Sequence, residues 1–318
     1  MSSLVAATIF LQGLVPLVAI LLIAMGPERS RASWLSQVAC AGALLAAVGL
    51  SGPALAVPWY LPRVMAGLLV VAVLSGARRI RGRWPASRLG WMGTVGAIGG
   101  TLVFLGISGH ALRGRRPPPG EPVTLSFPME GRTFLVASGG SNSLVNPHLR
   151  TLSQAFRAYR GQSFAIDLVA VGRWGSRSRG LTSSDPADYA VFGTEVRAPC
   201  DGTVVRAFDE APDMPVPVRS RDPIEGNHVI LDCGGIWVVM AHLQSGTVGV
   251  AEGQTVATGS PIGRVGNSGQ SDEPHLHIHA QTPGSVAEPL SGEPLPVRFG
   301  AWWPVRNGRT VGGDGSSS

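Results

Sequence analysis

The first third of the chain alternates between long apolar stretches and short segments that contain arginine. Each apolar stretch is close to the ~20 residues that a helix needs to cross the hydrocarbon core of a bilayer. The third stretch contains Arg63, which is near enough to one end for its guanidinium to reach the lipid headgroups. We therefore predict an all-α bundle of four transmembrane helices, over Leu4–Met25, Trp34–Leu50, Pro58–Ala77 and Leu89–Gly109.

From Val123 onward the pattern changes to short apolar runs rich in Val and Ile, such as FAIDLVAV, HVILDC, IWVVMAHL and HLHIHA. Runs of this length, separated by Gly, Pro, Asn or Asp, are typical of an antiparallel all-β domain. The expected organisation is a membrane anchor over 1–112, a stiff Pro- and Arg-containing linker over 113–122, a β domain over 123–310, and a disordered low-complexity tail over 311–318.

The net charge of +6 is unevenly distributed along the chain. Residues 1–118 contain 11 Arg and one acid, whereas the remainder contains 15 Arg and 19 acids. Positive-inside anchoring explains a basic excess within an apolar segment, so we expect no nucleic-acid partner. Seven Arg in the first and third connecting segments, against four after the second and fourth apolar stretches, predict that the first and third segments are cytoplasmic. The β domain is then expected on the extracytoplasmic side of the cell membrane, with the first span retained as an anchor.

Three of the seven histidines lie in one short run, PHLHIHA, at residues 274–280. On a strand, alternate side chains share a face, so His275, His277 and His279 are expected to project together while Leu276 and Ile278 face the core. Neighbours at i and i+2 are roughly 6–7 Å apart, but His275 and His279, at about 13 Å, are too far apart to share one metal ion. At most two of the three are expected to act on one centre.

Two further polar residues stand in apolar surroundings. A second candidate strand, Ser163–Val169, places Asp167 on the face opposite Ile166 and Leu168. His242 ends an apolar strand in VVMAHLQ. Taken alone, Asp167 would be interpreted as a surface carboxylate and His242 as an ordinary histidine at the edge of a strand.

Cys200 and Cys233 each lie at the edge of a predicted strand, in APCDG and LDCGG. An exported domain permits them to pair, and two unpaired buried thiols are the alternative. A bridge closing a loop of ~33 residues would stabilise the fold by about 3–4 kcal/mol on the loop-entropy model. Cys40 lies within the second apolar stretch and is expected to serve as a small apolar residue.

Several motifs between Gln162 and Ala280 follow one another in a fixed order. They are AID at 165–167, GTEVRAPCDGTVV at 193–205, GNHVILDCGG at 226–235, AHLQSGTVGVAEGQTVATGSPIG at 241–263 and GNSGQSDEPHLHIH at 266–279. This order resembles the lysostaphin-type, LytM-like zinc metallopeptidases, which cut peptide bonds in bacterial peptidoglycan. The resemblance covers about 120 of the 318 residues.

The resemblance implies a small antiparallel β domain, hybrid-sandwich-like, with a groove that binds peptidoglycan peptides. It implies one Zn²⁺ per chain, held by Asp167 and His277, and it gives His242 and His275 the handling of protons. Catalytic zinc takes three protein ligands and one open position, and it lowers the pKa of its water to about 7. The pKa of free histidine, about 6.5, suits proton transfer in the same range. Besides the bilayer, a membrane-protein partner stays an open possibility.

One position departs from the family pattern, in which the His of an H-x-x-x-D pair supplies a zinc ligand. This chain has Ser163 there, and a neutral hydroxyl is a poor zinc ligand. We predict that His148, on the Pro-containing loop VNPHLR, is the third ligand. His228, on another strand, and His279, where the family usually has an acid, are weaker candidates. His110, at the end of the fourth span, is expected to lie at the membrane interface.

Other classes of protein are excluded by single residues. Biotinyl and lipoyl carrier domains share similar glycine turns but need a modifiable lysine, and all 26 basic residues here are arginine. GNSGQ at 266–270 lacks the Asp that precedes the nucleophile of a serine protease, because Asn267 occupies that position. The remaining alternative is a degenerate LytM-like domain that binds the cell wall or activates another hydrolase, which Ser163 favours.

Overall fold

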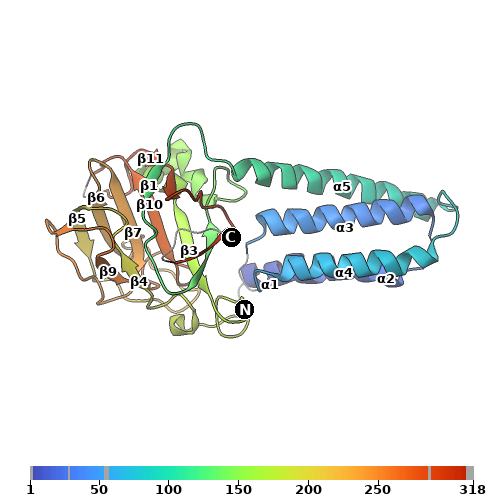
Figure 1. The fold of residues 1–318 in the computed structure, drawn as a ribbon, viewed down its shortest axis with the longest axis horizontal. Helices are drawn as coiled ribbons and strands as arrows, with labels where there is room; N and C mark the ends of the chain where they lie inside the picture. The colour runs from blue at the N-terminus through green and yellow to red at the C-terminus, as the bar shows by residue number, and fades with distance from the viewer. Residues whose placement is uncertain (1–2, 28, 54–56, 286–287, 313–318) are drawn as a thin grey trace. The chain divides into compact units, whose positions relative to one another are not determined.

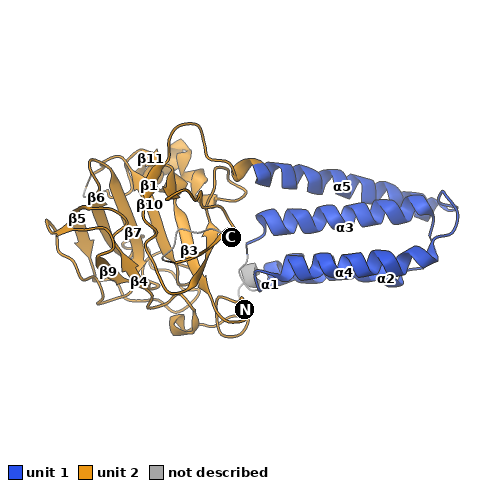
Figure 2. Ribbon diagram, in the orientation of Figure 1, with its two compact units in different colours: residues 1–112 blue, residues 113–318 orange. Residues whose placement is uncertain are grey.

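A computed structural model of the chain describes residues 3–27, 29–53, 57–285 and 288–312. The chain divides into two compact units, residues 1–112 and residues 113–318 (Figures 1 and 2). The first unit is helical and the second is built mainly from strands. Residues 313–318 of the expected tail lie outside the described part of the chain.

The helices of the first unit follow the apolar pattern of the sequence. They are α1 (Ser3–Ile9), the π-helical η1 (Phe10–Leu14), α2 (Val15–Met25), α3 (Arg31–Ser51), α4 (Leu61–Gly76), the short η2 (Ala77–Arg79) and α5 (Arg88–Gly114). Within the described residues, four helical segments are long and apolar enough to cross a membrane: Ala6–Met25, Arg31–Ser51, Leu61–Arg79 and Arg88–Gly114. The four predicted helices are thus confirmed. Because α5 continues to Gly114, His110 lies inside this helix rather than at its end.

The two sides of these helices differ in what they contact. Ile20 and Ile23 of α2, Ala41 of α3 and Met65 of α4 pack into one buried cluster. Large aliphatic side chains on the outer faces stay exposed, as Leu74 does at 69%. An apolar surface of this extent is suited to hydrocarbon rather than to water.

The second unit contains thirteen strands within its described residues. They are β1 (Val123–Leu125), β2 (Thr133–Ser138), β3 (Ile166–Val171), β4 (Glu195–Arg197), β5 (Gly202–Phe208), β6 (Asn227–Asp232), β7 (Trp237–Leu243), β8 (Thr255–Val256), β9 (Pro261–Arg264), β10 (Leu276–Gln281), β11 (Pro294–Leu295), β12 (Val297–Phe299) and β13 (Arg309–Val311). Short 3₁₀ segments accompany them: η3 (Pro147–Leu152), η4 (Gln154–Phe164) and η5 (Pro186–Asp188).

Nine of these strands form one antiparallel sheet in the order β13-β2-β3-β10-β7-β6-β5-β8, with β11 paired to β10. Figure 1 shows β3, β10, β7, β6 and β5 side by side. The described residues also form a parallel β1–β12 pair and an antiparallel β4–β9 pair. The prediction of an antiparallel β domain after the four apolar helices is confirmed.

One face of the central strands builds the hydrophobic core of this unit. Ile166 and Leu168 of β3, Met240 of β7, and Leu276 and Ile278 of β10 all belong to one buried cluster. Since side chains alternate along a strand, the residues between them point to the opposite face. That opposite face carries the polar residues of interest.

The predicted strand over Ser163–Val169 is wrong at its beginning. Residues 154–164 form the 3₁₀ segment η4, and the strand begins only at Ile166. The hydroxyl of Ser163 lies 2.6 Å from the backbone carbonyl of Arg160, a contact within a turn rather than across a sheet. Ser163 therefore does not share a strand face with Asp167.

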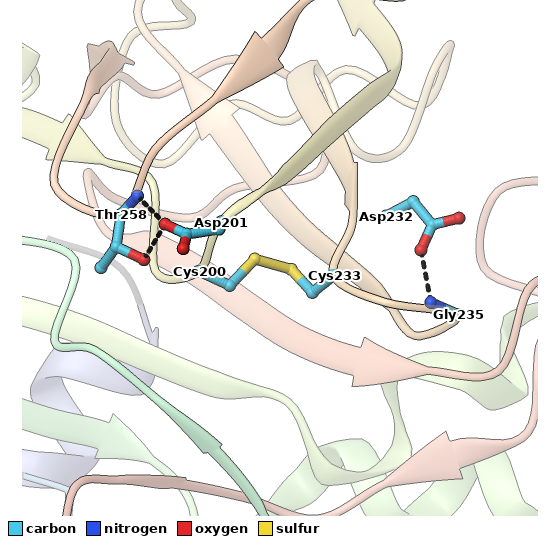
Figure 3. Close-up of a disulfide and its surroundings, with 6 residues drawn as sticks. All are labelled: Cys200, Asp201, Asp232, Cys233, Gly235 and Thr258. Carbon is cyan, nitrogen blue, oxygen red and sulfur yellow. Dashed lines mark hydrogen bonds between the residues drawn. A yellow bond between two sulfur atoms is a disulfide. The ribbon is translucent and has the colours of Figure 1, made fainter.

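The predicted pairing of two cysteines is confirmed by a disulfide between Cys200 and Cys233, whose Cα atoms are 6.0 Å apart (Figure 3). Cys200 precedes β5 and Cys233 follows β6, which pairs with β5, so the bond joins the ends of two neighbouring strands. Asp201, beside this bond, accepts hydrogen bonds from the backbone and hydroxyl of Thr258. Cys40 is the free cysteine of the described chain.

Candidate metal centre

The centre of the site is a pair of residues on adjacent strands. In the antiparallel register of β3 and β10, Asp167 lies directly opposite His277. Both stand on the face opposite the core residues, and Asp167 Oδ1 lies 3.1 Å from His277 Nδ1. The pairing of two core strands thus fixes this contact without help from any loop.

His148 joins the pair from the 3₁₀ segment η3. Its Nε2 is 3.6 Å from Asp167 Oδ2, and its ring centre is 5.0 Å from that of His277. The buried side chain of Asn146 caps η3: its amide nitrogen donates to the carbonyls of Gly140 and Ala165, and its oxygen accepts from the backbone N–H of His148.

The same cap determines which ring nitrogen of His148 carries the proton. Because the Asn146 nitrogen already donates to two carbonyls, its oxygen faces His148 Nδ1, 3.0 Å away. That oxygen only accepts, so Nδ1 carries the hydrogen and Nε2 presents a lone pair towards Asp167.

Ser163 lies close to this arrangement but does not reach Asp167 in any described contact. It is fully buried, and its hydroxyl lies 2.8 Å from the hydroxyl of Thr151. Thr151 in turn donates to the backbone carbonyl of His148 at 2.7 Å. Ser163 therefore supports the segment that presents His148.

His242 and His275 form the other half of the cluster. Their ring centres are 4.8 Å apart, and the ring centre of His242 is 5.7 Å from that of His277. His275 immediately precedes β10, and its Nε2 is 3.5 Å from Asp167 Oδ1. His242 is the penultimate residue of β7 and has φ 61°, a conformation that costs a non-glycine residue free energy. Its backbone N–H donates to the backbone carbonyl of Glu225, and its carbonyl accepts from the backbone N–H of Gly266. These two hydrogen bonds stabilise the conformation.

Backbone carbonyls orient these two imidazoles as well. His242 Nδ1 is 2.9 Å from the carbonyl of Ser268, and His275 Nδ1 is 2.8 Å from that of Glu273. A carbonyl only accepts, so both Nδ1 atoms carry hydrogen and both Nε2 atoms keep a lone pair. His148 and His275 therefore direct lone pairs towards one carboxylate.

Burial keeps three of these imidazoles in the protonation state that binds a cation. It lowers the pKa of His148 to about 4, although the Asp167 carboxylate opposes that shift. It also lowers the pKa values of His242 and His275. Burial alone would raise the pKa of Asp167, but the neighbouring imidazoles hold it well below its ordinary value. At neutral pH the site thus combines the anionic carboxylate of Asp167 with neutral imidazoles at His148, His242 and His275.

Two overlapping groups in the described chain could each hold a metal ion: His148, Asp167 and His277, and His242, His275 and His277. Within each group the candidate ligand atoms lie within 4.8 Å of one another. Neutral lone pairs facing a carboxylate repel it unless a cation lies between them, so the donor set fits a metal ion. Two imidazoles and one carboxylate are ligands that Zn²⁺ accepts.

The other predicted histidines lie outside these two groups. His279 is fully buried on β10 and contacts His277. His228, on β6, donates from Nδ1 to the carbonyl of Gly226 and stacks on Phe208. His110 belongs to helix α5.

Three features of the site were not identified from the sequence. Asn146 stands in an Asn-Pro-His run, which indicates a capped turn that presents the histidine. Gln281 continues the period-two pattern of PHLHIHA by one further step. Glu225, which is buried at 8% exposure and has its pKa raised by burial, carries no local signal that separates it from a surface acid.

Comparison with known proteins gives a match in the same part of the chain. Residues 184–289 match the family model described as peptidase family M23, a range that includes His242, His275 and His277 but not His148 or Asp167. The predicted resemblance to lysostaphin-type peptidases is thereby confirmed. No curated protein matches the chain significantly.

Solved structures similar to this chain include peptidases from three bacteria. A peptidase M23 from Pseudomonas aeruginosa is 21% identical, with 55% of this chain and 54% of that chain covered and a TM-score of 0.28. A zinc-containing peptidase from Vibrio cholerae is 16% identical over 55% and 39%, with a TM-score of 0.32. The catalytic domain of lysostaphin from Staphylococcus simulans is 26% identical over 30% and 65%, with a TM-score of 0.24. The chain thus spans about half or less of the length of the first two.

Acid is expected to destabilise the β unit in a way that depends on His228. Burial lowers the pKa of His228 to about 4, and in the described structure its Nε2 has no hydrogen-bond partner that a second proton could use. Between pH 6.5 and 4 the unfolded chain binds more protons at this residue than the folded chain, so stability falls as pH falls. From pH 7 to pH 5 this group should cost about 2 kcal/mol.

Pulse proteolysis in urea at pH 7, 6 and 5 measures this dependence. His228→Asn keeps a side-chain donor but does not titrate, so its stability should fall less steeply with acid than that of the natural chain. Equal pH slopes for the two chains would contradict the assignment.

Proposed function

From the match of residues 184–289 to the model of peptidase family M23, we propose that the protein is a membrane-anchored zinc metalloendopeptidase that hydrolyses peptide bonds of bacterial peptidoglycan. The supporting observation is the convergence of His148, Asp167 and His277 beside the His242–His275 pair. One Zn²⁺ per chain is the proposed cofactor, held by these first three residues.

The roles of the side chains follow from their hydrogen bonds. When bound, zinc would supply a Lewis acid and a water of lowered pKa. His242 and His275 each donate from Nδ1 to a backbone carbonyl, so their Nε2 atoms are free to accept a proton from the attacking water. The resulting imidazolium can return that proton to the leaving amine and stabilise negative charge on the carbonyl oxygen. Burial of both rings strengthens these interactions because it excludes water.

His148 takes the part that the family gives to the histidine at the position of Ser163. Its Nε2 points a lone pair at Asp167, while Ser163 is bonded to the backbone of Arg160 and to Thr151. A degenerate domain that binds the wall or activates another hydrolase is the second candidate. Ser163 favours it, whereas the five-residue cluster favours the enzyme.

The proposed location is the cell membrane, with the β unit on the extracytoplasmic side, where its substrate lies. Support comes from the arginine distribution and from the disulfide, because disulfides persist in oxidising compartments. The proposed partners are the lipid bilayer and peptidoglycan peptides. Nothing in the arginine pattern favours nucleic acid.

The proposed function is tested by variants that should lose activity but keep zinc, and by one that should lose both. His242→Ala and His275→Ala should each lower the rate of peptide release from purified peptidoglycan by roughly 10²–10⁴-fold while zinc stays bound. His277→Ala should lose both zinc and activity. Zinc content is measured by elemental analysis of the purified chain. Loss of zinc from His275→Ala with retention in His277→Ala would reverse the assignment, and an active chain without any metal would refute it.

The third ligand is tested by zinc affinity alone. His148→Ala should weaken zinc binding more than about 100-fold, because removal of a direct ligand exceeds the usual 10–100-fold effect of outer partners. Asp167→Ala should act similarly. Ser163→Ala is the matched control and should change affinity by less than about tenfold, since it acts only through the support of η3. If Ser163→Ala has the larger effect, the assignment of His148 is wrong.

The membrane topology is tested by a reporter fused after Pro122 in the full anchor. An enzyme reporter that needs disulfides should be active there, and a reporter that works only in the cytoplasm should be inactive. The opposite result would place the β unit inside the cell and remove peptidoglycan as its substrate.

A further inference from the structure

We propose that Gln281 and His279 keep a hydrogen on His277 Nε2, so that Nδ1 is the ring nitrogen left to bind a cation together with Asp167. The two residues continue the polar face of β10 beyond His277. Nothing in the proposed function assigns them a role. Their effect on zinc rests on that function, whereas the tautomer itself does not.

The relay begins at a backbone carbonyl. Gln281 Nε2 donates to the carbonyl of Pro289 at 2.9 Å. Since that carbonyl only accepts, the amide nitrogen must face it and the amide oxygen must face the other way. Gln281 Oε1 then lies 3.2 Å from His279 Nε2. The orientation of the glutamine amide is thus set by the backbone.

The direction of hydrogen-bond donation is set in turn along β10, from Gln281 to His279 and then to His277. Because Gln281 Oε1 is an acceptor, His279 Nε2 carries hydrogen. His279 is fully buried, and no carboxylate is among its hydrogen-bonding neighbours, so a second proton on its ring would be an unpaired buried charge. His279 Nδ1 is therefore an acceptor, and His277 Nε2, 3.2 Å away, donates to it.

The consequence appears at the metal centre. With Nε2 donating to His279, Nδ1 is the ring nitrogen of His277 that is left to face Asp167 Oδ1, 3.1 Å away. A cation bound between these two atoms would use the lone pair of Nδ1 while the hydrogen stays on Nε2. Without the relay, His277 could place its proton on Nδ1 and donate it to Asp167, closing the two ligands into an ordinary hydrogen bond. The relay removes this competing state, as the Asn146 cap does for His148.

Two glycines leave room for the glutamine amide. A Cβ atom at Gly161 would come 1.7 Å from Gln281 Oε1, and a Cβ atom at Gly292 would come 2.7 Å from Gln281 Nε2. Gly161→Ala should therefore displace the amide without removing any polar group. It provides a second way to break the relay.

Nitrogen NMR of the full chain in lipid bilayers, labelled with ¹⁵N histidine and free of metal, reads the tautomer directly. His279 should show a protonated Nε2 and an unprotonated Nδ1. Gln281→Leu and Gly161→Ala should reduce that preference, and Gln154→Leu, at an exposed glutamine, should leave it unchanged. A proton on His279 Nδ1 in the natural chain would overturn the proposal, whether or not the chain binds zinc.

Zinc affinity, measured by competition with a chelator, gives the second readout. Gln281→Leu and His279→Leu should weaken binding about 10–100-fold, the usual effect of partners that orient a metal-binding histidine. His279→Gln should stay within about threefold of the natural chain, because its oxygen can accept from His277 while its nitrogen donates to Gln281. If His279→Gln binds as weakly as His279→Leu, hydrogen-bond polarity is not the cause.

The two proposals fail differently. The predicted tautomer in a chain that binds no zinc would leave the relay standing and refute the proposed function. Tight zinc binding that Gln281→Leu does not change would support the metal site and refute the relay.

Discussion

The antiparallel pairing of β3 with β10 is the constraint on which the rest of the site depends. It places Asp167 opposite His277 within the middle of a sheet, where both strands are held by neighbours on each side. The opposite face of the same strands contributes four residues to the core: Ile166, Leu168, Leu276 and Ile278. A shift of one residue in this register would bury the polar pair in the core and expose the aliphatic side chains. Core packing therefore holds the first two candidate ligands in place.

A second constraint sets which ring nitrogen keeps a lone pair in three of the histidines. An oxygen that can only accept a hydrogen bond faces Nδ1, so the hydrogen stays on Nδ1 and the lone pair on Nε2. The carbonyls of Ser268 and Glu273 face His242 and His275, and Asn146 presents its oxygen to His148. These acceptors lie on backbone or on a buried cap, so their positions are fixed by the fold. Uncharged oxygens therefore orient these three imidazoles, and burial keeps the rings neutral.

The sequence predicted those parts of the site that depend on local periodicity. Alternation in IDLV and in HLHIHA was enough to place Asp167 and His277 each on the polar face of its own strand, and the lengths of the apolar stretches were enough to identify the four apolar helices. The beginning of β3 could not be predicted in the same way, because Ser163 follows the alternation of the strand but is bonded within a turn to Arg160. Glu225 could not be predicted for a related reason, because the residues near it, such as His242, come from another part of the chain.

The separate origin of His148 has a thermodynamic consequence. Asp167 and His277 belong to the sheet, whereas His148 belongs to a short 3₁₀ turn held by Asn146, Thr151 and Ser163. An ion shared by all three would link that turn to the sheet, so the free energy of binding would also be free energy of ordering the turn. By reciprocity, anything that loosens residues 146–152 would lower the affinity by the fraction of time the turn is displaced. A ligand supplied by a turn rather than by a strand would make metal occupancy sensitive to the conformation of that turn.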